Sequence, residues 1–199
     1  MKKKAKNLIV LGALGLLPAL ALAHPGHGAE DALHAGAGFL DGFIHPFTGL
    51  DHLAAMLAVG VWSALAVRPV WLAPAAFVAL LTAGAAAGFA GVAVPAVEPM
   101  IAASLLVLGL LVAWRRHLPL ALAAGLTGVF AFFHGAAHGA ELAGGSQWLA
   151  LAGMVIATAL LHAAGVVLGR MVMARHRWLA VAGGAGTALL GAAMLARLA

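Results

Sequence analysis

The sequence contains no cysteine and no tyrosine, and only 9% of its 199 residues are charged. The lack of cysteine excludes disulfide bonds and thiolate metal sites. The low charge and a hydrophobic content of 64% exclude an ordinary soluble domain, in which about a quarter of the residues are charged. With a mean hydropathy of +1.07, the chain is expected to be solvated by lipid.

Two sequence motifs typical of enzymes are also missing. No GxxxxGK[ST] loop is present, which excludes ATP hydrolysis through that motif, and no HExxH zinc-hydrolase motif occurs. The isoelectric point near 10.9 would suit a nucleic-acid-binding protein, but the basic residues are few and do not form one patch. We therefore expect no enzymatic activity and no nucleic-acid partner.

The N-terminus has the pattern of a secretory signal peptide. "MKKKAK" is a cationic segment, "LIVLGALGLLPALALA" contains an apolar core, and "ALA" at 21–23 fits the small-residue cleavage pattern. The predicted domains are a signal peptide at 1–23 and a transmembrane domain at 24–199. Cleavage would remove four lysines and leave seven basic and six acidic residues, a net charge of +1. An uncleaved first transmembrane helix is the alternative.

Six apolar segments follow, and each approaches the roughly 20 residues that a membrane-spanning helix needs. They cover residues 46–66, 70–90, 97–114, 118–140, 148–169 and 178–197. Since backbone groups in lipid must pair within their own segment, the predicted fold is an all-α bundle of six transmembrane helices. Alternate loops carry the basic residues, which are Arg68, then Arg115 and Arg116, then Arg170, Arg175 and Arg177. The positive-inside rule places these loops in the cytoplasm and both mature termini outside the cytoplasmic membrane of a bacterium.

The first apolar segment contains charged and polar residues that lipid disfavours. The stretch "FIHPFTGLDHLAAML" includes His45, Asp51 and His52. An aspartate at the centre of a membrane helix costs about 2.5–3.5 kcal/mol on insertion scales. Pro46 suits the first turn of a helix, which would leave His45 at the outer mouth of the membrane.

A second polar group lies at the outer end of the fourth segment, in "FFHGAAHGAE". His134 and His138 are four residues apart and share a helix face, to which Glu141 also belongs. Because this helix ends on the outer side, where the first one begins, the two groups are predicted to lie at one depth. Imidazole and carboxylate together suit nickel, cobalt, zinc and copper. Further candidate ligands are His24 and His27 in the mature N-terminal stretch and His162 on the fifth helix.

The motifs "HPFTGLDHLAAMLAVGVW" and "FHGAAHGAE" resemble the two signatures of the HupE/UreJ family, the hydrogenase and urease accessory membrane proteins regarded as nickel permeases. The resemblance implies that the metal-related positions are His45, Asp51, His52, His134, His138 and Glu141. It also implies uptake of a divalent metal ion, Ni²⁺ ahead of Co²⁺ or Zn²⁺, as transported substrate and without a permanent cofactor. Two alternatives remain open, an intramembrane zinc hydrolase and a metal sensor or donor that does not translocate. A metallochaperone or a second copy of the chain could be a further partner.

The signal-peptide prediction can be checked by intact-mass measurement of the protein purified from membranes. We expect a mature chain that begins at His24, since the cleavage pattern ends at Ala23. Recovery of residues 1–23 on the mature chain would instead indicate a seventh membrane helix.

Overall fold

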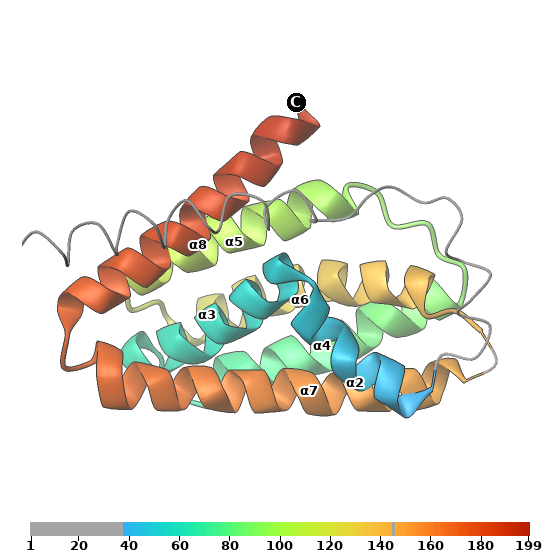
Figure 1. The fold of residues 1–199 in the computed structure, drawn as a ribbon, viewed down its shortest axis with the longest axis horizontal. Helices are drawn as coiled ribbons and strands as arrows, with labels where there is room; N and C mark the ends of the chain where they lie inside the picture. The colour runs from blue at the N-terminus through green and yellow to red at the C-terminus, as the bar shows by residue number, and fades with distance from the viewer. Residues whose placement is uncertain (1–37, 145) are drawn as a thin grey trace, which may run out of the picture. The chain divides into compact units, whose positions relative to one another are not determined.

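Helices make up all the regular structure of this computed structural model in its described residues, 38–144 and 146–199. The predicted signal peptide, His24 and His27 lie outside these residues. Figure 1 shows the arrangement of the helices. Their bounds are α2 Phe39–Thr48, α3 Leu50–Ala66, α4 Leu72–Phe89, α5 Val97–Trp114, α6 Leu120–Glu141, α7 Gln147–Leu168, the π-helical turn η2 Gly169–Met173 and α8 Arg177–Leu198.

Five of the helical segments are long and apolar enough to cross a membrane, namely α4, α5, α6, α7 with η2, and α8. The helices α2 and α3 form a sixth span if the bent pair is counted as one. The prediction of an all-α bundle of membrane helices is thereby confirmed, with segment limits close to those read from the sequence. Large apolar side chains on the outer faces, such as Leu160 and Leu189, are exposed, as expected where lipid is the solvent.

The first span differs from the prediction. Pro46 does not open a helix, because it lies inside α2, which begins at Phe39. The chain breaks instead at Gly49, whose backbone is extended (φ −91°, ψ 117°), and α3 leaves at 84° to α2. Two local features weaken the helix here: Pro46 has no N–H to bond the carbonyl four residues earlier, and the Thr48 hydroxyl donates to the carbonyl of His45 at 2.7 Å. His45 on α2 and His52 on α3 therefore lie on helices that run in different directions.

The direction of α2 is set by close packing against α7. A Cβ atom on Gly42 would lie 1.8 Å from the carbonyl oxygen of Ala150, and one on Gly153 would lie 2.1 Å from the carbonyl oxygen of Phe39. These two glycines let the backbones of α2 and α7 touch, as small residues do between membrane helices. Helix α2 therefore packs along α7, as the blue and orange ribbons of Figure 1 show.

Helix α3 is the centre of the bundle. Eleven of its 17 residues are buried, and it contacts α4, α5, α7 and α8. The closest pairs around it are α4 with α6, α5 with α8, and α3 with α7. The metal-ligand candidates on α3 are therefore surrounded by other helices and not by lipid.

The arginine-bearing turns meet at one end of the bundle. The indole Nε1 of Trp62 donates to the carbonyl of Arg116 at 2.8 Å, and the guanidinium of Arg115 donates to the carbonyl of Met173. His117 joins the same group, since its Nδ1 lies 2.7 Å from the carbonyl of Ala66. Exposed tryptophans stand at helix ends, as is typical of membrane interfaces: Trp71, Trp114 and Trp178 at this end and Trp148 at the other.

The pair α4 and α6 is held together by glycines that the motifs GAAAG and GAAHG supply. A Cβ on Gly84 would lie 2.0 Å from the carbonyl oxygen of Phe132, and one on Gly135 would lie 1.9 Å from that of Leu81. The small-xxx-small patterns thus serve helix packing. Because Gly135 sits between the two histidines of α6, this contact also fixes the rotation of that helix.

We predict that Gly135→Ala destabilises the bundle, because the new methyl group would collide with a backbone oxygen. Overpacking of this kind costs about 1–3 kcal/mol of unfolding free energy. Gly125→Ala is the matched control, since it changes the same helix at a position with nothing within 4 Å. Thermal unfolding of both variants in detergent measures the difference, and equal midpoints would contradict the packing described.

Candidate metal centre

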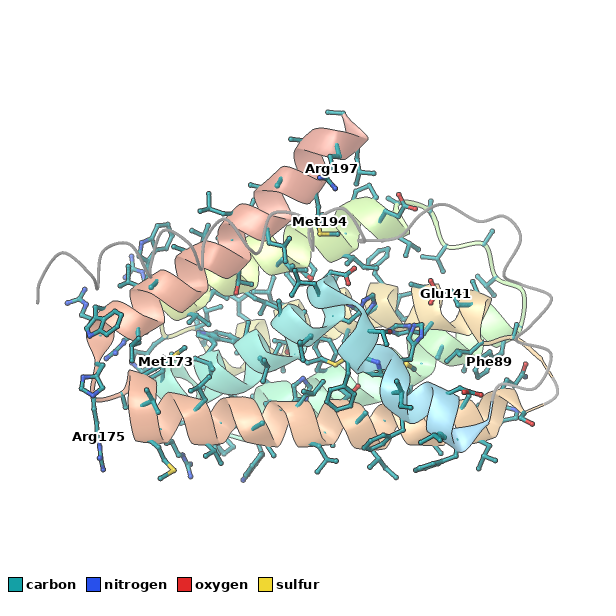
Figure 2. All side chains as sticks on the ribbon, viewed as in Figure 1. Phe89, Glu141, Met173, Arg175, Met194 and Arg197 are labelled. Carbon is teal, nitrogen blue, oxygen red and sulfur yellow. The ribbon has the colours of Figure 1, made fainter. Side chains whose placement is uncertain are left out.

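The candidate residues gather at the end of the bundle away from the arginine-bearing turns. Helix α6 begins just after those turns, and its 22 residues carry Glu141 roughly 33 Å away. Figure 2 shows Glu141 and Arg175 at opposite ends of the helices. His45 of α2 reaches the same end, since it contacts Glu141 directly.

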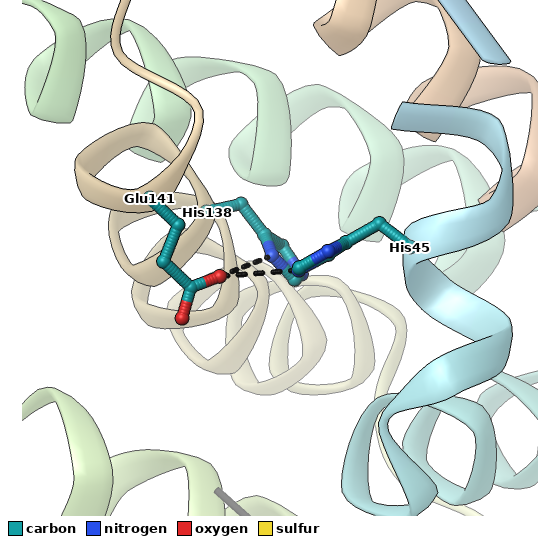
Figure 3. Close-up of side chains that lie close together, drawn as sticks. All are labelled: His45, His138 and Glu141. Carbon is teal, nitrogen blue, oxygen red and sulfur yellow. Dashed lines mark hydrogen bonds and ion pairs between the residues drawn. The ribbon is translucent and has the colours of Figure 1, made fainter. Parts of the chain in front are cut away.

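Three side chains form an outer triad, which consists of His45, His138 and Glu141. The Oε2 atom of Glu141 lies 3.1 Å from His45 Nε2 and 3.5 Å from His138 Nδ1. One ligand atom from each residue lies within 4.8 Å of the others. Figure 3 shows the carboxylate facing both rings from the end of α6. His45 and Glu141 are partly accessible, with 27% and 26% of their side chains exposed, whereas His138 is fully buried.

Two further imidazoles lie below the triad, His52 on α3 and His134 on α6. Their ring centroids are 4.9 Å apart, and that of His52 is 4.3 Å from His138. His138 also contacts His45, at 4.6 Å, so its ring touches both levels. His134 is fully buried and His52 is 6% exposed. The imidazoles thus form a continuous series from the partly accessible end into the closed interior.

Asp51 acts on this series through His52. Its Oδ1 atom accepts the Nδ1–H of His52 at 2.9 Å and also the backbone N–H of His52 at 2.9 Å. Carboxylates placed behind metal-ligating histidines fix the tautomer and make the ring a better ligand. Gly49 leaves the space for the pair, because a Cβ there would lie 2.8 Å from Asp51 Oδ1.

Ser104 of α5 forms a hydrogen bond with the ring of His134, as Asp51 does with the ring of His52. Its hydroxyl donates to the carbonyl of Ile101 at 2.6 Å, so its oxygen accepts from His134 Nε2, 3.0 Å away. This pattern corresponds to the tautomer of His134 that has its proton on Nε2 and its lone pair on Nδ1. A serine on a different helix is not marked by sequence spacing, and only the fold reveals it.

The remaining ring nitrogens have nothing in the described chain to bind. His52 Nε2, His134 Nδ1 and His138 Nε2 are buried and have no hydrogen-bond partner there. Leaving a buried polar group unpaired costs about 1–3 kcal/mol. Imidazole nitrogens next to a carboxylate are ligand types that divalent transition metals prefer. Within the described residues, the ligand atoms grouped within 4.8 Å of one another are those of the triad.

The structure therefore brings five of the predicted residues into one group, His45, His52, His134, His138 and Glu141. Asp51 contacts the group only through His52. His162 of α7 lies outside this group. The ring of Phe77 contacts both His134 and His162, with centroid distances of 5.7 Å and 5.0 Å. The spacing of the motifs did not predict Ser104, Phe77 or the role of Gly49.

The fold and this cluster define a class, a multi-pass helical membrane protein with a partly buried cluster of imidazole and carboxylate groups at one end. A family model described as HupE / UreJ protein matches residues 12–194. Protein HupE of Rhizobium leguminosarum bv. viciae is 44% identical over 202 residues, which cover 97% of this chain and 98% of that protein. The chain belongs to the HupE/UreJ family of hydrogenase and urease accessory proteins. No solved structure matches it.

The bond from His134 to Ser104 predicts that Ser104→Ala weakens metal binding, since the loss of a group behind a ligand costs about 10–100-fold in affinity. Ser63→Ala is the matched control, because Ser63 is equally buried and its hydroxyl donates to a backbone carbonyl, that of Val70. Calorimetric titration of the purified proteins with Ni²⁺ measures the effect. Equal affinities for the two variants would show that Ser104 does not orient the ligand.

Proposed function

We propose that the chain is a permease that carries a divalent metal ion, with Ni²⁺ as the first candidate, across the bacterial cytoplasmic membrane into the cell. The metal serves the maturation of a nickel enzyme, a hydrogenase or a urease. The family to which the chain belongs and its similarity to Protein HupE support this assignment. In this role the protein is not an enzyme, and the metal is its substrate.

The observation that carries the proposal is the series of buried imidazoles with unpaired nitrogens behind a partly exposed triad. A resident structural ion would be expected in a closed site, whereas this group opens to one end of the bundle through His45 and Glu141. An arriving ion exchanges water first for the triad. It then passes to His52 and His134 by way of His138, whose ring touches both levels.

Charge explains why carboxylates accompany the histidines. A divalent ion held by neutral imidazoles alone would keep its full charge in an apolar interior, where uncompensated charge is strongly disfavoured. Glu141 is itself a member of the triad, and Asp51 sits behind His52. The ion in turn lowers the free-energy cost of placing two carboxylates at membrane depth.

The arginine-bearing turns orient the molecule in this proposal. Their common position at one end agrees with a cytoplasmic face, and the ligand cluster then faces outward. The membrane potential, negative inside, favours inward movement of a divalent ion by about 4.6 kcal/mol per 100 mV. This free energy supports a gradient on the order of a thousandfold without ATP.

Uptake of radioactive nickel into proteoliposomes with an inside-negative potential tests the proposal. We expect uptake by the wild-type protein and, for Asp51→Asn, a loss of about tenfold or more, because the negative charge behind His52 is removed. Asp41→Asn is the matched control, since Asp41 is exposed and accepts only the backbone N–H of Gly38 at the start of α2.

The possible outcomes separate the alternatives. Nickel binding without accumulation in the vesicles would indicate a sensor or donor in place of a permease. Wild-type uptake by Asp51→Asn would show that the carboxylate has a purely structural role.

A further inference from the structure

His162 is a buried histidine outside the outer cluster, which consists of the outer triad with Asp51, His52 and His134. It lies on α7, about 22 Å along the helix from Gln147, and is only 1% exposed. Neither of its ring nitrogens has a hydrogen-bond partner in the described part of the chain. A histidine that serves packing would be expected to pair with the backbone, as His117 does with the carbonyl of Ala66. Packing therefore does not explain why a histidine stands at this position.

Thr158, one turn earlier on α7, is unusual in a related way. Thr48, Thr82, Thr127 and Thr187 all direct their hydroxyl to a carbonyl three or four residues earlier. The hydroxyl of Thr158 points across to α3, where it lies 3.5 Å from the sulfur of Met56. Both residues are fully buried. A hydroxyl of α7 and a thioether of α3 thus face each other, and the unpaired imidazole of His162 lies one turn further along α7.

These groups continue the series that begins at the outer triad. The ring of Phe77 contacts His134 on one side and His162 on the other. Measured along their helices, His134 lies about 10 Å from the outer end of α6, whereas His162 lies about 22 Å from the outer end of α7. His162 is therefore the next ligand-bearing position toward the arginine-bearing end.

We propose that His162, Met56 and Thr158 form an inner station that holds the transported metal ion after it leaves the outer cluster. This inference rests on the proposed transport function. Imidazole nitrogen and thioether sulfur are ligands for late first-row metals and suit Mg²⁺ or Ca²⁺ poorly. The inner station therefore adds selectivity at a second point of the path.

The station is built to hold an ion weakly. Its three groups are neutral, whereas the outer cluster has the charges of Glu141 and Asp51. Conduction requires that each site bind the ion strongly enough to accept it and weakly enough to release it. A neutral inner station beyond a charged outer one satisfies that condition.

The test compares His162→Leu with the wild type in three measurements on the full-length protein. We expect nickel flux into proteoliposomes to fall about tenfold or more, because a ligand of the path is lost. We expect Ni²⁺ affinity by calorimetry, dominated by the outer cluster, and the unfolding midpoint to stay unchanged. A purely structural role for His162 would alter the midpoint, and a role in the outer cluster would alter the affinity; either result overturns the inner station.

Unchanged flux in His162→Leu, with wild-type uptake intact, overturns the inner station and leaves the proposed permease standing. If the wild-type protein itself moves no nickel, the proposed permease function is wrong, and the proposed inner station is wrong with it.

If His162→Leu does not fold, two nearly isosteric variants provide a second test. Thr158→Val and Met56→Leu each remove one polar atom and preserve most of the volume. Thr82→Val is the matched control, because that hydroxyl bonds only to its own helix. We expect the flux of both station variants to lie about threefold or more below the control, as for loss of a single weak ligand. Flux equal to the control in both variants overturns the proposal.

Discussion

The constraint on which this structure depends is a set of buried imidazole nitrogens that have no hydrogen-bond partner within residues 38–144 and 146–199. A membrane interior offers no water to satisfy them, and each unpaired group costs about 1–3 kcal/mol. The bundle nevertheless places His52 Nε2, His134 Nδ1 and His138 Nε2 on touching rings. The surrounding structure maintains this arrangement, since Asp51 and Ser104 occupy the opposite nitrogens of two rings. In the proposed function, a divalent cation is the partner of the nitrogens that remain.

Packing far from the ligands holds the rings in this position. The glycines of α4 and α6 fix the rotation of the helix that carries His134 and His138. The break at Gly49 turns α2 across α7, which brings His45 to Glu141 and leaves room for the pair of Asp51 and His52. Glycine therefore has two roles here, close approach of helices and space beside a ligand. Both follow from the absence of a Cβ atom, and both place ligands from three helices at one end of the bundle.

The sequence predicted the helices well, because an apolar run of about 20 residues can form few structures in lipid other than a membrane-spanning helix. It also placed His134, His138 and Glu141 on one face, since spacings of three and four residues are local properties of a helix. The direction of α2 was not predictable, because it depends on Gly42 and Gly153, which are distant in the chain. Ser104 and Phe77 were missed for the same reason, as neither lies near the motifs that it contacts. The interpretation of Pro46 was wrong, since a proline can sit inside a short helix whose end follows within a turn.

The most direct test is X-ray absorption at the nickel edge on purified protein loaded with one equivalent of Ni²⁺. A shared site predicts a first shell of nitrogen and oxygen atoms with the outer-shell scattering of several imidazole rings, and a weaker imidazole signal in His52→Ala and in His134→Ala. The two variants should lose the signal to a similar extent, because the rings bind one ion together. A shell of oxygen atoms alone, or a spectrum that neither substitution changes, would contradict the account.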